Sequence, residues 1–283
     1  MPELPEVENI KRTLFRDLSL PQKVDSIVFL RKDLRFPIPI KSLKNLKGKI
    51  LIDINRRGKY LLFQFTKEIL LSHLGMSGYW RVEHNHFRDK KLLKHDHVII
   101  SFNSSLQLIY NDPRRFGFID FIPQSDSINL NPFIAKLGME PLDEFMDENY
   151  LNKLGKLSHK NIKTFIMDQH NLVGIGNIYA SEILFESGVH PSAIASQLSI
   201  SDWERITRET KKILHKAIKL GGSTIKDYKK SDGTSGSFQN FFKVYNRANQ
   251  NCDSCGNKIC HSIIQSRSTY WCEHCQPIKH LKM

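Results

Sequence analysis

Apolar residues near the start of the chain recur at helical spacing. Between Glu3 and about Arg16 the apolar positions lie mostly three or four residues apart: Leu4, Val7, Ile10, Leu14 and Phe15. One face of an α-helix has this spacing. We therefore predict an amphipathic helix at the N-terminus.

After Pro21 the pattern changes to short runs with period-two character, separated by turn residues about every ten positions. We predict a strand in each of seven runs: 24–30, 49–55, 60–65, 69–73, 97–102, 106–110 and 118–122. Short strands at this even spacing are typical of a β-sandwich or a β-barrel.

The second half of the chain is predicted to be helical. Residues 123–132 are mostly polar and flanked by prolines, which is typical of an interdomain linker. The clearest helix is expected to begin at Ser201-Asp202-Trp203-Glu204, which has capping-box spacing, and to stop at Gly221-Gly222. Residues 223–237 are rich in Gly, Ser, Lys and Asp and are expected to form a loop.

Composition narrows the class of protein. The chain has 283 residues, enough for two domains, and its 42 Lys and Arg against 29 Asp and Glu give a formal charge of +13. An excess of positive charge favours polyanionic partners. Because no run of 18 apolar residues occurs and the first eight residues contain three glutamates, we expect a soluble cytoplasmic protein without membrane association.

Four of the five cysteines form two pairs. Cys252 and Cys255 have two residues between them, as do Cys272 and Cys275, and sixteen residues separate the pairs. This is the spacing of a four-cysteine zinc site on a hairpin. Four thiolates leave no open position for water, so we expect one structural Zn²⁺ and no catalytic metal. Cys260 is expected to be a spare thiol.

The opening residues Met1-Pro2-Glu3 offer a nucleophile. A small second residue is the usual condition for loss of the initiator methionine, after which Pro2 would carry the α-amine. Such an amine has a pKa of about 7.7 to 8.0 and can form an iminium ion with an aldehyde-like carbon. Glu3 and Glu6 are candidate acid/base groups beside it. The structural alternative is a capped helix start, with Pro5 in the first turn and carboxylates near the positive end of the helix dipole.

Several loops could contact a nucleic acid. Gly174-Ile175-Gly176-Asn177 precedes a helical stretch and could bind phosphate there, or form a tight turn. The basic turn 56–59 could clamp a phosphate or be solvated surface. Met76 and the Arg-Arg-Phe run of loop 112–117 resemble side chains that proteins insert between base steps, although each loop alone also has a structural interpretation. His95 and His97 flank Asp96 at a strand start, where they are more often structural than ligands.

Taken together, these motifs point to one family. They are Met-Pro-Glu-Leu-Pro-Glu-Val-Glu at the start, Arg-Arg-Gly-Lys-Tyr-Leu, His-Leu-Gly-Met-Ser-Gly, Lys-His-Asp-His-Val, Asp-Pro-Arg-Arg-Phe-Gly, Gly-Ile-Gly-Asn-Ile-Tyr-Ala-Ser-Glu, Ser-Asp-Gly and the cysteine hairpin. In this order they make the chain resemble the formamidopyrimidine-DNA glycosylases, also called 8-oxoguanine-DNA glycosylases, over essentially its whole length.

The resemblance implies an α+β protein with an N-terminal helix and β-sandwich, a C-terminal helix-two-turn-helix domain and a zinc-finger hairpin. The domains expected from it are 1–130, 131–240 and 241–283. It also implies a monomeric base-excision repair enzyme whose partner is double-stranded DNA with oxidised bases or abasic sites. Such an enzyme excises oxidised purines as a glycosylase and cuts the abasic strand as a lyase, by β,δ-elimination.

The resemblance assigns roles residue by residue. Pro2 matches the nucleophile, Glu3 the acid/base beside it and Glu6 a carboxylate that holds the site's geometry. Lys59 and Arg267 complete the catalytic set. The matched DNA contacts fall into three groups, which are phosphate contacts at Lys59, His73, Asn177 and Arg267, other contacts at His95 and Lys163, and the side chains that replace the extruded base at Met76, Arg114 and Phe116. Residues 227–238 match the segment that closes over that base.

Small departures and two alternatives accompany this assignment. Met139 stands where a proline is common, and Asn246 and Asn249 replace frequent glycines, which puts local turns in doubt but no catalytic role. One alternative is the sister class that prefers oxidised pyrimidines and shares the proline nucleophile. The other is a non-enzymatic nucleic-acid scaffold, which leaves Pro2 and Glu3 unexplained.

Overall fold

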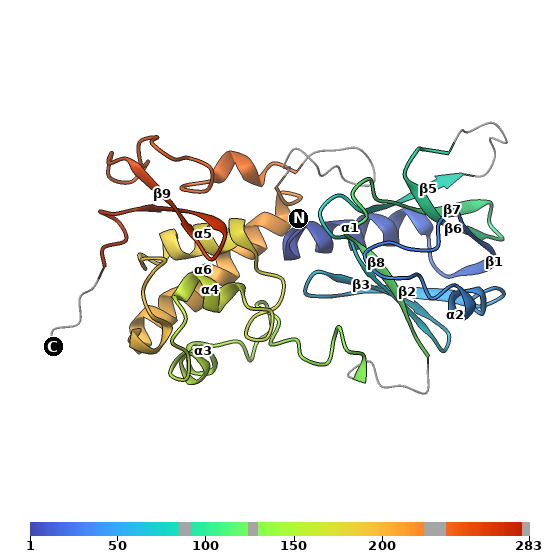
Figure 1. The fold of residues 1–283 in the computed structure, drawn as a ribbon, viewed down its shortest axis with the longest axis horizontal. Coiled ribbons are helices and arrows are strands. Elements are labelled where there is room, and N and C mark those ends of the chain that lie inside the picture. The colour runs from blue at the N-terminus through green and yellow to red at the C-terminus, as the bar shows by residue number, and fades with distance from the viewer. Residues whose placement is uncertain (85–91, 124–129, 224–235, 279–283) are drawn as a thin grey trace. The chain divides into compact units, whose positions relative to one another are not determined.

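The computed structural model describes residues 1–84, 92–123, 130–223 and 236–278 and divides the chain into two compact units (Figure 1). Unit 1 comprises Met1–Ala135 and Gly221–Ser237, and unit 2 comprises Lys136–Leu220 and Phe238–Met283. Within the described ranges, no helix is both long and apolar enough to cross a membrane. Most of the predicted linker and of the predicted loop 223–237 lies outside the described residues.

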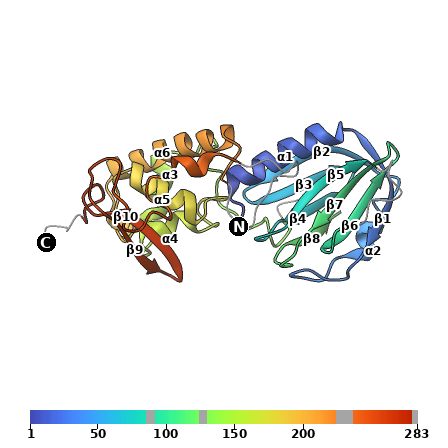
Figure 2. The ribbon, with the colours of Figure 1, turned by 90° about the horizontal axis from the view of Figure 1, so that it is seen from above.

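Unit 1 is a β-sandwich with a helix packed along it (Figure 2). Its elements are α1 (Leu4–Leu18), β1 (Gln22–Phe29), α2 (Ile40–Lys44), β2 (Ile50–Arg57), β3 (Tyr60–Phe65), β4 (Ile69–His73), β5 (Tyr79–His84), β6 (Asp96–Phe102), β7 (Leu106–Asn111) and β8 (Phe118–Ile122). The predicted N-terminal helix is confirmed, and it buries Leu4, Val7, Ile10 and Leu14. Its neighbours are β2, β3 and β5.

The strands are antiparallel and follow the order β5-β7-β6-β1-β2-β3-β4-β8. Strand β1 belongs to both layers, because Gln22 and Lys23 pair with β2 while Val24–Phe29 pair with β6, with an irregularity between Val24 and Ser26. A bulge bends a strand and increases its twist, which lets one continuous sheet fold over itself. One apolar core fills the space between the layers.

Strand β5 (Tyr79–His84) was not predicted. It offers only Trp80 and Val82 as apolar positions, and its Arg81 is buried. Arg81 is buried because its guanidinium pairs with both carboxylate oxygens of Asp96 at 2.6 and 2.8 Å. The local apolar pattern did not reveal this strand, because the burial of Arg81 depends on Asp96, which lies fifteen positions away in the sequence.

Unit 2 contains a helical part and a cysteine hairpin. Its elements are α3 (Glu148–Gly155), α4 (Ile162–Met167), α5 (Asn177–Glu186), the 3-10 turn η2 (Ala195–Gln197), α6 (Ile200–Lys219), the 3-10 turn η3 (Phe238–Phe241), β9 (Ile259–Ile264) and β10 (Arg267–Cys272). Helix α5 begins after the N-cap Gly176 and is buried from Ile178 to Phe185, as its apolar sequence predicts. Gly188 follows it with φ +65°, a conformation that favours glycine.

Helix α6 confirms the helix predicted there but begins earlier than expected. The N-cap is Ser199 and not Ser201, because the reciprocal capping partner is Asp202. The Ser199 hydroxyl accepts from the Asp202 amide at 3.2 Å, and Asp202 Oδ2 accepts from the Ser199 amide at 3.0 Å. Asp202 is also buried and accepts from Arg205, so this carboxylate fixes the first turn. The sequence holds two overlapping capping boxes, and burial decides between them.

Candidate functional site

The predicted nucleophile and both carboxylates lie at the start of α1, where Pro2 precedes the N-cap Glu3 and Glu6 is in the first turn. Pro2, Glu3 and Glu6 are all buried. Glu6 Oε2 accepts the Glu3 amide at 2.9 Å, while Oε1 accepts the amide and hydroxyl of Ser223 at 2.7 and 3.1 Å. The carboxylate predicted to hold the geometry therefore links the chain start to residue 223.

Gly222 is needed for this link. Its φ is +78°, and a Cβ there would lie 2.7 Å from Glu6 Oε1. Any side chain would therefore push the Ser223 amide away from the carboxylate. The Gly221-Gly222 pair ends α6 and also brings the chain to Glu6.

Lys59 lies in the turn between β2 and β3, and His73 ends β4, the strand that pairs with β3. Lys59 follows Gly58 in this turn and is only 6% exposed. The next residue, Tyr60, is the register partner of His73, and their rings lie 5.0 Å apart. The His73 ring also stacks on Phe118, with centroids 5.5 Å apart.

The imidazole of His73 is neutral near pH 7. Burial, together with the positive charges of Lys59 and Arg35, lowers its pKa to about 4. Nδ1 accepts the Gly75 amide at 3.1 Å, so Nε2 carries the ring proton. His73 can thus donate a hydrogen bond to an anion, but it contributes no charge.

Met76, Arg114 and Phe116 lie on two loops whose backbones touch. Phe116 is 45% exposed, and the Arg114 guanidinium lies 4.8 Å above its ring centroid. A Cβ on Gly75 would overlap the backbone of Phe116 and Gly117. The structure therefore brings the loop of Met76 against the loop of Arg114 and Phe116, whose guanidinium and apolar ring are exposed.

The region around His95 is tied to the sheet. His97 is buried, and its Nε2 lies 2.9 Å from the Asp112 carbonyl oxygen. His95 precedes β6, and its carbonyl accepts the Asp112 amide at 3.1 Å. Asp96 accepts from Arg81 and also from the side chain of Asn111 at 2.7 Å. His97 and Asp96 are structural, while the DNA contact assigned to His95 stays a prediction.

In unit 2, the backbone carbonyl of Ser268 accepts hydrogen bonds from two predicted site residues and lies next to a third, Arg267. The Ser268 carbonyl accepts from Lys163 Nζ at 2.9 Å and from Asn177 Nδ2 at 3.0 Å, and Ser268 follows Arg267. Lys163 is 2% exposed and also donates to Thr269 Oγ1 at 2.7 Å. Its ammonium thus faces the hairpin, and its assignment as a DNA contact stays a prediction.

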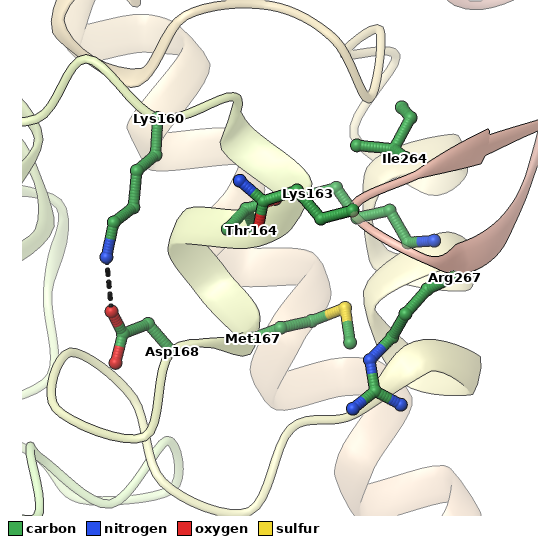
Figure 3. Close-up of a pocket in the computed structure, with 8 residues that line it drawn as sticks. Lys160, Lys163, Thr164, Met167, Asp168, Ile264 and Arg267 are labelled. Carbon is green, nitrogen blue, oxygen red and sulfur yellow. Dashed lines mark hydrogen bonds and ion pairs between the residues drawn. The ribbon is translucent and has the colours of Figure 1, made fainter.

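A pocket of about 300 Å³ separates α4 from the turn of the hairpin (Figure 3). Its lining combines the apolar Met167 and Ile264 with polar and charged residues, among them Lys160, Lys163, Asp168 and Arg267. Lys160 donates to Asp168 at 2.7 Å on one side of the pocket, and Arg267 lies on the other side. Arg267 begins β10 directly after Gln265 and Ser266, which turn the hairpin with positive φ values of 46° and 60°.

The two cysteine pairs come together as their spacing predicts. The sulfurs of Cys252, Cys255, Cys272 and Cys275 all lie within 4.8 Å of one another. Four Zn–S bonds of about 2.3 Å in a tetrahedron put neighbouring sulfurs about 3.8 Å apart, so the cluster has the dimensions of a metal site. Cys260 is not part of this group.

Glu182 is a buried carboxylate at the end of the Gly-Ile-Gly-Asn-Ile-Tyr-Ala-Ser-Glu motif, and the sequence alone indicated no role for it. Its two oxygens accept three consecutive backbone amides, Lys243 at 2.8 Å, Val244 at 3.0 Å and Tyr245 at 2.8 Å. Burial raises the pKa of this carboxyl group, and the three amides oppose the rise. Glu182 therefore fixes the segment that leads into the cysteine hairpin onto α5.

Known protein families and relatives match nearly the whole length of this chain. Residues 1–119 match the family model "Formamidopyrimidine-DNA glycosylase N-terminal domain", and residues 137–229 match "Formamidopyrimidine-DNA glycosylase H2TH domain". A formamidopyrimidine-DNA glycosylase of Bdellovibrio bacteriovorus is 43% identical over 281 residues, covering 98% of this chain and 100% of the relative. One of Acinetobacter baylyi is 42% identical over 280 residues, with 99% of each covered.

Solved structures of DNA complexes are similar over the same length. A Lactococcus lactis Fpg mutant bound to Fapy-dG DNA has a TM-score of 0.88 at 35% identity, covering 98% of this chain and 100% of that one. The Lactococcus lactis Fpg with abasic-site DNA has a TM-score of 0.86 at 35% identity and covers 97% of this chain and 99% of that one. MutM with carbocyclic 8-oxo-G DNA has a TM-score of 0.85 at 36% identity, with coverage of 98% and 100%.

Proposed function

This chain belongs to the formamidopyrimidine-DNA glycosylase family, and we propose that it excises oxidised purines from duplex DNA and then cleaves the abasic strand by β,δ-elimination. The relatives are glycosylases by name, and the solved neighbours hold DNA with Fapy-dG, 8-oxo-G or an abasic site. The observation that carries the proposal is the start of α1, where Pro2 is buried next to Glu3 and the Glu3 amide is bonded to the buried carboxylate of Glu6.

The proposed chemistry starts with removal of Met1, which frees the secondary amine of Pro2. That nitrogen forms a bond to C1′ of the damaged nucleotide, the glycosidic bond breaks, and the base leaves with the electron pair and a proton. Opening of the sugar ring gives an iminium ion, and Glu3 transfers protons at the sugar. Loss of a proton from C2′ then expels the 3′ phosphate, and the second elimination expels the 5′ phosphate.

The glycosidic carbon is inaccessible inside a duplex, so the nucleotide has to be extruded first. The vacated stack costs a few kcal/mol per step unless other groups fill it. Met76, Arg114 and Phe116 supply that filling, with the guanidinium facing the orphaned cytosine. Their placement on two adjoining loops supports this role.

Phosphate contacts give affinity without sequence preference. Lys59 and Arg267 contribute charge, whereas His73 and Asn177 contribute neutral hydrogen bonds. The metal is a structural Zn²⁺, held by four thiolates that leave no open position for a reacting water. Its hairpin carries Arg267.

Borohydride trapping tests the mechanism. Wild-type protein incubated with a lesion-bearing duplex should give a covalent adduct, and Pro2→Gly should lose it far more than Lys59→Ala. Mass spectrometry of the intact N-terminus reports whether Met1 is removed. An adduct that forms equally well without Pro2 contradicts the mechanism. Cleavage of 8-oxoguanine and thymine glycol duplexes side by side separates the purine preference from the sister class.

A further inference from the structure

We propose that Asp112 is a positioning residue that holds the loops 74–78 and 113–117 as one unit, so that the side chains that fill the vacated stack enter the DNA together. This inference rests on the proposed function, because it needs the extrusion step. Asp112 itself is fully buried and touches none of the reacting atoms we assign.

The carboxylate of Asp112 reaches both loops. Oδ1 accepts the Ser77 hydroxyl at 2.6 Å and the Arg114 amide at 3.3 Å. Oδ2 accepts the Gly117 amide at 2.9 Å. Ser77 Oγ also accepts the Arg114 amide at 3.1 Å. Ser77, which follows Met76, is therefore joined through Asp112 to Arg114 and to Gly117, which follows Phe116.

Asp112 is in turn fixed to the sheet. Its amide donates to the His95 carbonyl at 3.1 Å, and its own carbonyl lies 2.9 Å from His97 Nε2. Tyr110 donates its hydroxyl to Oδ2 at 3.4 Å, and burial raises the pKa of that phenol well above its ordinary value, so the hydroxyl stays a donor. The anchor of the two loops is therefore part of the rigid sandwich.

Three glycines let the two loops pack closely against each other and against Tyr110. A Cβ on Gly117 would overlap the Tyr110 hydroxyl, and one on Gly78 would overlap the same hydroxyl. Gly75 presses against the backbone at Phe116 and Gly117 from the other loop. If the two loops were free, ordering them when they enter the DNA would cost conformational entropy. Because the hydrogen bonds to Asp112 order them in the folded protein, that cost does not fall on the insertion step.

Asp112→Asn is the sharp test. Asparagine has the same shape as aspartate, but one carboxylate oxygen is replaced by an NH₂ group. That NH₂ group cannot accept the hydrogen bonds that Asp112 accepts from the loops. We expect single-turnover excision of 8-oxoguanine paired with cytosine to fall at least about tenfold, and strand cleavage at an abasic site facing a one-nucleotide gap to stay near wild type. A 2-aminopurine beside the lesion should report a slower fluorescence rise, since it brightens when the stack opens.

Two further variants interpret this result. Ser77→Ala removes only the link to the Met76 loop and should reduce excision in the same direction but less, with little loss of folding. Asp120→Asn is the matched control, because Asp120 lies on β8 and its side chain accepts from Asn131, which belongs to neither loop. It should excise the paired lesion as wild type does. Melting temperatures of all variants are measured alongside.

The outcomes separate the two proposals. A folded Asp112→Asn protein that excises the paired lesion at the wild-type rate overturns the inference, and so does an equal loss on both substrates. A wild-type protein that opens the stack but never excises contradicts the proposed function instead. In that case the fluorescence rise, compared between wild type and Asp112→Asn, still decides the role of Asp112.

Discussion

Replacing His73 with glutamine should remove a pH dependence from the stability of unit 1. The pKa of His73 is about 4 in the folded protein, against an ordinary value of 6.5. Because the unfolded chain takes up this proton at higher pH, the stabilising contribution is complete above about pH 6.5 and is lost as the pH falls toward 4. By linkage, the loss between pH 7 and pH 5 is about 2 kcal/mol.

The variant lacks this titration. Its free energy of unfolding should be lower than wild type at pH 7, because it loses the stacking on Phe118, but the deficit should shrink by about 2 kcal/mol at pH 5. Urea unfolding at several pH values measures this difference, followed by tryptophan fluorescence, to which Trp80 in the core of the sandwich contributes. His170→Gln is the control, because His170 lies in unit 2 and is exposed.

An NMR titration checks the cause directly. The imidazole resonance that disappears in His73→Gln identifies His73, and it should not shift between about pH 5.5 and pH 8. A midpoint near 6.5, or an unchanged deficit between pH 7 and pH 5, would refute the reasoning from burial and from the charges of Lys59 and Arg35.

Three other predictions concern charge, metal and a buried carboxylate. Arg267→Ala should reduce the slope of log binding constant against log salt by about 0.9, while His73→Gln leaves it unchanged, as DNA-binding titrations at several salt concentrations would measure. Cys255→Ala, or a chelator, should release one equivalent of metal, detected with a colorimetric zinc indicator, and lower the melting temperature of unit 2. Glu182→Gln should cost about 1–3 kcal/mol in urea unfolding, because a single amide oxygen cannot accept three backbone amides; an unchanged midpoint would contradict its anchoring role.

The fold was predictable where local pattern decides it. The bounds of β3, β4 and β8 are those predicted from the sequence, because each is a short, mostly apolar run with turn residues nearby, although β3 and β4 bury consecutive positions and not one face alone. Strand β5 was missed because the burial of Arg81 depends on Asp96 in another strand. The start of α6 was misplaced because two capping boxes overlap, and only burial of Asp202 selects Ser199.

For the site, spacing sufficed where the ligands are close in sequence. The cysteine pairs predicted a metal cluster because each pair forms a short knuckle. The neutral state of His73 was not predictable, since it depends on Phe118, Lys59 and Arg35, which only the fold brings near. Likewise, the resemblance assigned Lys163 only as a DNA contact, and its bond to the Ser268 carbonyl, 105 positions away, could not be predicted from the sequence.

The bond between Glu6 and Ser223 joins positions that are 217 residues apart. A ribosome makes the first turn of α1 at once but reaches Ser223 only after most of the 283 residues are complete. A chain synthesised only as far as α6 therefore contains Glu6 without its partner Ser223. Late in translation, the Glu6 carboxylate gains Ser223 as its second hydrogen-bond partner, and the first residues of α1 are then held as in the folded protein.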